Sequence, residues 1–226
     1  MSLAVNEQHR LGEWREKPTP PAPLRVLAAV VSYAFHPVFV PVYIVVFILY
    51  LHPFLFAGYS GWEKSIALAQ AFVMFTFFPL VTVLLLRAVK FVDSIFLRTQ
   101  KDRIIPLVAT GIWYFWIWHV WRNLPDRPTE AVMLPLGVWI AASLAILANI
   151  YLKISLHTIA MGILLCYCGY LALRTPDIGL YLCIAVFIAG LVTTARLLIS
   201  DHTQKEIYLG LLLGFGSQCI AVVAMS

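Results

Sequence analysis

The chain has 226 residues, of which 62% are hydrophobic and 12% are charged. Average soluble domains are about 45–50% apolar and about 25% charged, so a chain of this size cannot bury the excess in one aqueous core. The composition excludes a disordered chain and predicts an integral membrane protein. The net charge of +5 comes from lysines and arginines beside apolar segments, which favours anionic headgroups or an anionic substrate over nucleic acid.

The first 24 residues are polar and rich in proline, with prolines at positions 18, 20, 21 and 23. They lack the apolar centre and the cleavage site of a signal peptide. We therefore expect an irregular, partly polyproline-like tail, followed by a first membrane helix that directs insertion. On this basis the chain divides into a tail, residues 1–24, and one membrane-embedded domain, residues 25–226.

Seven apolar stretches follow the tail, each long enough to cross about 30 Å of hydrocarbon at about 1.5 Å per helical residue. The sequence therefore predicts an all-α fold, a polytopic bundle of about seven transmembrane helices. Gly210 and Gly214, four residues apart in the last stretch, are expected to let a neighbouring helix approach closely. The expected helices cover residues 26–51, 66–86, 104–121, 131–152, 156–173, 178–199 and 207–225.

Seven spans would put the two ends of the chain on opposite sides of the membrane. The tail would then share its side with the loops at 87–103, 153–155 and 200–206. All 16 lysines and arginines lie on that side except Lys64, Arg122, Arg127 and Arg174. By the positive-inside rule, we expect the tail and these loops in the cytoplasm.

The reactive polar side chains near the membrane gather on the side of the tail. Arg196 lies in the last turn of the sixth span, and His202 and Glu206 are four residues apart where the seventh begins. Positions i and i+4 of a helix share a face, so the Glu206 carboxylate can hold one nitrogen of His202 and raise the basicity of the other. His157 begins the fifth span on the same side. The other members of this set are Arg98, Lys101, Asp102, Arg103, Ser155 and Asp201.

Two histidines, one of them with a carboxylate partner, suit phosphoryl transfer when they lie beside several cations. The cations would bind the non-bridging oxygens and neutralise charge in the transition state. One histidine would attack phosphorus, and the other would protonate the leaving oxygen. The catalytic candidates are His202, His157 and Glu206. The phosphate-binding candidates are Arg196, Lys101, Arg103, Ser155 and Arg98.

These residues resemble the signatures of a known family. The motif Arg196-x5-His202-x3-Glu206 resembles the third signature of the type 2 phosphatidic acid phosphatase superfamily, which reads Ser-Arg-x5-His-x3-Asp. Ala195 stands in place of the serine of that signature, and Glu206 in place of the aspartate, which keeps the charge.

The other two signatures have weaker counterparts on the same side of the membrane. The segment from Ile154 to His157 resembles the second signature, Pro-Ser-Gly-His. The basic segment from Arg98 to Pro106 stands where the first, Lys-x6-Arg-Pro, would lie. The resemblance covers residues 87–215. It implies a core of six membrane helices and a metal-free, cofactor-free dephosphorylation of a lipid phosphate through a phosphohistidine.

Structural roles for the same residues remain open. Thr203 followed by Glu206 fits a capping box for the last helix, and Ser155 fits the N-cap of the fifth span. The basic residues at 98–103 also suit lipid headgroups. His36, followed by Pro37 inside the first span, suits either packing at a kink or the lining of a site, and we favour packing.

Three functional hypotheses follow from the sequence. The first is a metal-independent phosphatase or phosphotransferase that acts on a polyprenyl or phosphatidyl (di)phosphate in the bilayer. The second is a non-catalytic lipid-phosphate binder or carrier. The third is a metallohydrolase that uses His157, His202, Glu206 and Asp201. Phosphate release separates the first two, and sensitivity to chelators reveals the third. The sequence leaves the oligomeric state open.

Overall fold

The computed structural model describes residues 3–5, 11–13, 20–92 and 99–226, and helices make up most of this part of the chain. Six helices are long and apolar enough to cross a membrane, so the protein is a polytopic integral membrane protein. They confirm six of the seven expected spans. These helices are Gly61–Ala88, α5 (Gln100–Arg122), α6 (Thr129–Tyr151), α7 (Leu156–Arg174), α8 (Gly179–Ile199) and α9 (Gln204–Met225).

The first of these six helices has a local irregularity. It consists of α3 (Gly61–Phe72), the π-helical turn η2 (Val73–Phe77) and α4 (Phe78–Ala88). Pro79 follows η2 directly, and because proline has no N–H, regular hydrogen bonding is interrupted at this point. A short 3₁₀ turn, η3 (Pro176–Ile178), connects α7 to α8.

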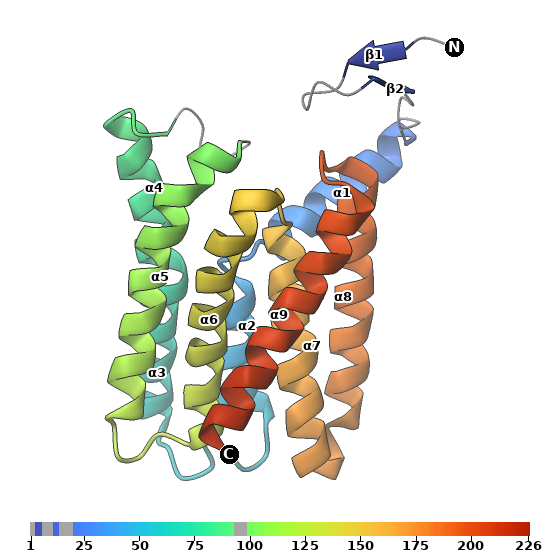
Figure 1. Ribbon diagram of the computed structural model, residues 1–226. Coiled ribbons are helices and arrows are strands. Elements are labelled where there is room, and N and C mark those ends of the chain that lie inside the picture. Colours follow the sequence, from blue (N-terminus) through green and yellow to red (C-terminus); the bar gives the residue numbers. More distant parts are fainter. Residues whose placement is uncertain (1–2, 6–10, 14–19, 93–98) are drawn as a thin grey trace.

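The expected first span, residues 26–51, is not one helix. It is divided into α1 (Ala22–Ala34) and α2 (Val40–Val46), which continues into the π-helical turn η1 (Phe47–Leu51). Pro37 has no N–H and disfavours helical geometry in the residue before it, so the helix ends ahead of His36-Pro37. In Figure 1, α1 lies obliquely at one end of the bundle and α2 continues toward the other. The seventh crossing therefore stays a prediction.

The tail contains two short strands that the sequence did not predict. β1 (Leu3–Val5) and β2 (Leu11–Glu13) pair antiparallel, with Ala4 opposite Gly12. Helix α1 then begins at Ala22, inside the segment that we assigned to the tail.

The six long helices alternate in direction along the chain. Figure 1 shows the starts of α5, α7 and α9 and the ends of α4, α6 and α8 at the end of the bundle where α1 also begins. The C-terminus lies at the opposite end. The loops that carry the candidate residues 153–157 and 200–206 therefore meet at the end of the bundle where α1 begins, which we call the α1 end.

Glycines bring α7 and α9, the most extensively packed pair of helices, into close contact. A Cβ atom added to Gly214 would lie 1.9 Å from the Ile159 carbonyl oxygen, and one on Gly162 would lie 2.1 Å from the Leu211 carbonyl oxygen. The prediction that Gly210 and Gly214 admit a neighbouring helix is confirmed. This contact places the first turn of α9 beside the first turn of α7.

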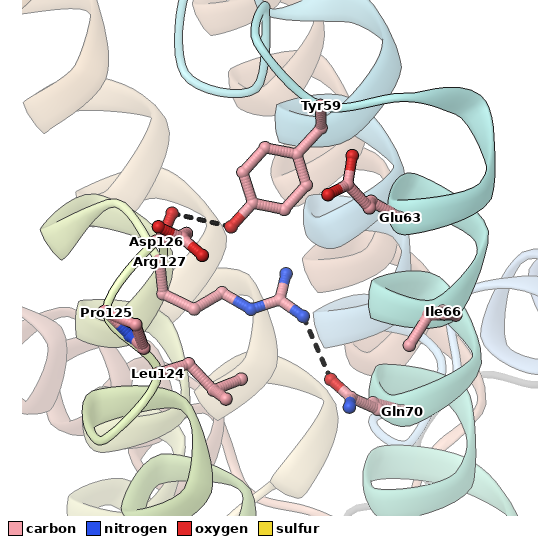
Figure 2. A pocket seen from close by; sticks show the side chains of 8 residues that line it. All are labelled: Tyr59, Glu63, Ile66, Gln70, Leu124, Pro125, Asp126 and Arg127. Atoms are coloured by element: carbon pink, nitrogen blue, oxygen red, sulfur yellow. Dashed lines mark hydrogen bonds between the residues drawn. The ribbon is translucent and has the colours of Figure 1, made fainter.

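A half-buried arginine holds the opposite end of the bundle together. Figure 2 shows Arg127 extending from its loop toward α3, where its Nη2 donates to the Gln70 Oε1 at 3.0 Å. Trp121 donates to the same oxygen at 3.1 Å. The Arg127 guanidinium carbon also lies 4.8–5.9 Å from the centres of the Phe56, Tyr59 and Trp121 rings, close enough for cation–π attraction. Arg127 thus has a structural role.

We expect Gly214→Ala to lower the free energy of unfolding in detergent by at least ~2 kcal/mol, because the new methyl group would overlap the backbone of α7. Gly216→Ala is the matched control on the same helix, since no atom lies within 4 Å of its added Cβ. Thermal unfolding of the two variants tests this. Equal melting temperatures would contradict the close approach of α7 and α9.

Candidate functional site

A cavity of about 780 Å³ lies between the helices at the α1 end. It falls within the range of about 300–1,000 Å³ typical of small-molecule sites. Its polar lining comes from the ends of helices and the loops between them. These residues include Ser32, His36, Arg103, Lys153, His157, Arg196, Ser200, Asp201 and His202. Further along the helices the walls are mostly apolar, as at Val83, Leu107, Val138, Ala141 and Ile163.

The loop between α8 and α9 presents His202 to this cavity. The His202 Nδ1 lies 3.5 Å from the Glu206 Oε2. The same carboxylate oxygen accepts a hydrogen bond from the Thr203 N–H at 2.8 Å, and the Thr203 hydroxyl accepts one from the Glu206 N–H. Glu206 thus serves in the capping box of α9 and also faces His202. Capping fixes the carboxylate in place beside the imidazole.

The surroundings of His202 favour its neutral form. Its side chain is buried, and burial lowers its pKa to about 4. The positive charges of Arg103 and Arg196 contribute to this lowering, while Glu206 and a hydrogen bond to the Lys153 backbone oppose it. A neutral imidazole has the lone pair that a nucleophile needs.

Arg196 is linked to His202 through Ser200. The Ser200 hydroxyl donates to the Arg196 carbonyl oxygen and accepts from the His202 N–H at 3.4 Å. The Arg196 Nε is buried and has no hydrogen-bond partner within the described part of the chain. The guanidinium of Arg196 lines the cavity from the last turn of α8.

Arg103 reaches the cavity from the second turn of α5. It is buried, and its Nη1 donates to the Ile154 carbonyl oxygen at 2.8 Å. A reciprocal pair fixes the start of α5. The Gln100 side chain donates to the Asn149 carbonyl oxygen at 2.8 Å, and the Asn149 side chain donates to the Gln100 carbonyl oxygen at 2.7 Å. The helix ends around the cavity are therefore held by hydrogen bonds.

His157 lies in the first turn of α7, on the side of the cavity formed by α1. Its Nε2 is 3.1 Å from the Ser32 carbonyl oxygen. Its ring meets the His36 ring edge to face, with centroids 5.4 Å apart. His36, for which we favoured packing, packs on His157 and also lines the cavity.

Three predicted phosphate ligands are not placed at the cavity. Lys101 is exposed and does not line it, and Arg98 lies outside the described residues. Ser155 is fully buried at the N-cap position of α7, but its side chain makes no capping hydrogen bond. Its N–H donates to the Glu206 carbonyl oxygen at 3.3 Å, which joins the starts of α7 and α9.

Sequence reasoning missed two groups that line the cavity, Lys153 and Ser32. Lys153 lies two residues before Ser155, and this proximity to a candidate motif was the available signal. Ser32 contributes through its backbone, which no residue pattern in α1 predicts.

The cavity lining has more cationic than anionic side chains, since Arg103, Lys153 and Arg196 face a single carboxylate, Asp201. This balance favours an anionic group at the α1 end. Among the described residues, no three His, Cys, Asp or Glu side chains form a group that could hold a metal ion.

No protein-family model, curated protein or solved structure matches this chain.

The lowered pKa of His202 predicts a pH-dependent stability. Between about pH 6.5 and pH 4 the unfolded chain binds a proton at this residue and the folded chain does not, so stability falls as the pH falls through this window. The free energy of unfolding measured across this range should therefore fall less steeply with decreasing pH in His202→Asn than in wild type. The control is His119→Asn, at an exposed histidine on α5. Equal pH dependence of wild type and His202→Asn would show that His202 is not held neutral.

Proposed function

We propose that this protein is a membrane lipid-phosphate phosphatase or phosphotransferase that works through a phosphohistidine. The observation that carries the proposal is one cavity with histidines and cations at one end and apolar walls beyond them. A phosphate group suits the cationic end, and a hydrocarbon chain suits the apolar walls. Polyprenyl and phosphatidyl phosphates or diphosphates combine both parts, so they are the proposed substrate class.

In the proposed complex, the phosphate lies between the two histidines. Arg196, Arg103 and Lys153 bind its non-bridging oxygens and neutralise the charge that develops during transfer.

In the first step, a His202 nitrogen attacks phosphorus while the bond from phosphorus to the lipid oxygen breaks. The phosphate binds as its monoanion, and its proton passes to the neutral His157. The electron pair of the breaking bond goes to the leaving oxygen, which takes this proton from His157. Glu206 stabilises the positive charge that forms on the His202 ring.

In the second step, water attacks the phosphohistidine. His157, now neutral, accepts a proton from the water, and the electron pair of the phosphorus–nitrogen bond returns to His202. Inorganic phosphate takes this proton from His157 and leaves as its monoanion, so both histidines regain their starting protonation. A lipid hydroxyl in place of water would give phosphotransfer.

The catalytic roles predict a graded loss of activity. We expect His202→Ala to lower turnover at least ~1,000-fold, because no other group can form the covalent intermediate. His157→Ala should lower turnover about 100- to 1,000-fold, because the proton donor is lost. Glu206→Gln should lower turnover less than either histidine variant, since glutamine also completes a capping box but carries no charge. Phosphate release from a panel of lipid phosphates, with purified protein in detergent and EDTA present, measures these effects.

Each alternative has its own outcome in this assay. Equal phosphate release by wild type and His202→Ala would overturn the phosphohistidine mechanism. No release from any lipid tested would favour the non-catalytic binder. Activity that EDTA abolishes and a divalent metal restores would favour the metallohydrolase.

We also propose that the tail and the site face the cytoplasm of a bacterial cell, and that the C-terminus lies across the membrane. The excess of lysine and arginine in the loops at the α1 end supports this orientation. Reporter fusions at both ends of the chain test it. Two ends on the same side of the membrane would contradict a crossing by residues 22–51.

A further inference from the structure

The break between α1 and α2 changes the hydrogen bonding of the α1 backbone. In a continuous helix, the Ser32 carbonyl would accept the N–H of His36, four residues later. Here the His36 N–H donates instead to the Tyr33 carbonyl oxygen at 3.3 Å. The cause is Pro37, which disfavours helical geometry at His36. The break therefore releases the Ser32 carbonyl.

His157 forms a hydrogen bond with the Ser32 carbonyl oxygen that the break leaves without its helical partner. Its Nε2 lies 3.1 Å from the Ser32 oxygen. A carbonyl oxygen can only accept a hydrogen bond, so the Nε2 must carry the proton. The other ring nitrogen of His157, Nδ1, is then the one left for a substrate.

The same break supplies a second contact to His157. The His36 ring meets the His157 ring at 81° with centroids 5.4 Å apart, in an edge-to-face geometry that aromatic rings favour. The carbonyl fixes one nitrogen and the neighbouring ring limits rotation, so the two contacts together define the orientation of His157.

Two other carbonyls at the break are bound by side chains of neighbouring helices. The Tyr43 hydroxyl donates to the Ala34 carbonyl oxygen at 2.8 Å, and the Thr76 hydroxyl donates to the Val38 carbonyl oxygen at 2.7 Å. Of these three carbonyls, that of Ser32 is the one bound by a candidate catalytic side chain. Side chains therefore bind three backbone groups at the break, and one of these groups faces the site.

We infer that the His36-Pro37 break is a positioning element of the candidate site, in which the Ser32 carbonyl and the His36 ring fix His157 with its Nδ1 toward the substrate. His36 acts through His157 and is a positioning residue. The assignment of proton transfer to His157 rests on the proposed function, but the tautomer and the ring orientation do not.

Nitrogen NMR of histidine-labelled protein in detergent tests the tautomer without any need for activity. We expect the His157 signal, identified by its loss in His157→Asn, to show a neutral ring protonated at Nε2. His36→Ala and Pro37→Ala should each shift it toward a mixture of tautomers. The matched control is Tyr43→Phe, which removes a hydrogen bond from the same break without touching His157.

Two outcomes of this experiment would overturn the inference. One is a wild-type His157 protonated at Nδ1. The other is a His157 signal that both His36→Ala and Pro37→Ala leave unchanged.

Kinetics with the lipid phosphate that wild-type protein hydrolyses fastest test the consequence for catalysis. We expect His36→Ala to lower kcat about 10- to 100-fold with KM nearly unchanged, because a small misplacement of a reacting group costs about this much. His36→Phe should restore most of the rate, since phenylalanine keeps the ring contact.

The kinetic outcomes separate this inference from the proposed function. An unchanged kcat in His36→Ala would exclude the positioning role. Failure of His36→Phe to restore the rate at a normal melting temperature would mean that His36 itself moves protons, which also contradicts positioning. A wild-type protein that hydrolyses no lipid phosphate would refute the proposed function, and the NMR result would still decide the inference.

Discussion

The backbone of a membrane protein must satisfy its own hydrogen bonds, because the bilayer core holds no water to do so. The non-helical segment between α1 and α2 would violate this requirement if it faced lipid. Instead it borders a cavity, and side chains from α2, η2 and α7 bind its carbonyls. The hydrogen bond between His157 and the Ser32 carbonyl thus serves two purposes. A bound carbonyl both stabilises the break and orients the imidazole.

The contact between α7 and α9 builds the rest of the site. Backbone packing at Gly162 and Gly214 sets the two helices so close that the Ser155 N–H reaches the Glu206 carbonyl oxygen. His157 and His202 consequently start from neighbouring helix ends. Reactive polar groups suit helix ends, since charge is costly deeper in the bilayer and the apolar helix middles remain available for a hydrocarbon chain. The site is therefore polar at the helix ends and apolar toward the helix middles, as the membrane is polar at its surface and apolar at its centre.

Hydropathy predicted the six long helices because each is a single apolar run, and the spacing of His202 and Glu206 predicted their pairing because both lie in one helical turn. Hydropathy failed where the apolar run continues through Pro37, since it does not detect a change of backbone geometry. Lys101 was grouped with Arg103, although residues two apart on a helix point in different directions. The role of Ser32 was not predictable, because every residue has the same backbone carbonyl.

The charge balance around His202 links binding to reactivity. Burial and the nearby guanidiniums keep the ring neutral, and Glu206 opposes them. A phosphate bound to Arg103 and Arg196 would offset their positive charge at the ring. Burial would then remain as the main influence against protonation, and Glu206 as the charge that favours it. In the proposed mechanism, the neutral ring would act as a nucleophile, and it would carry positive charge more easily once the phosphate is bound. The arginines that hold the substrate would thus also influence how easily His202 carries positive charge.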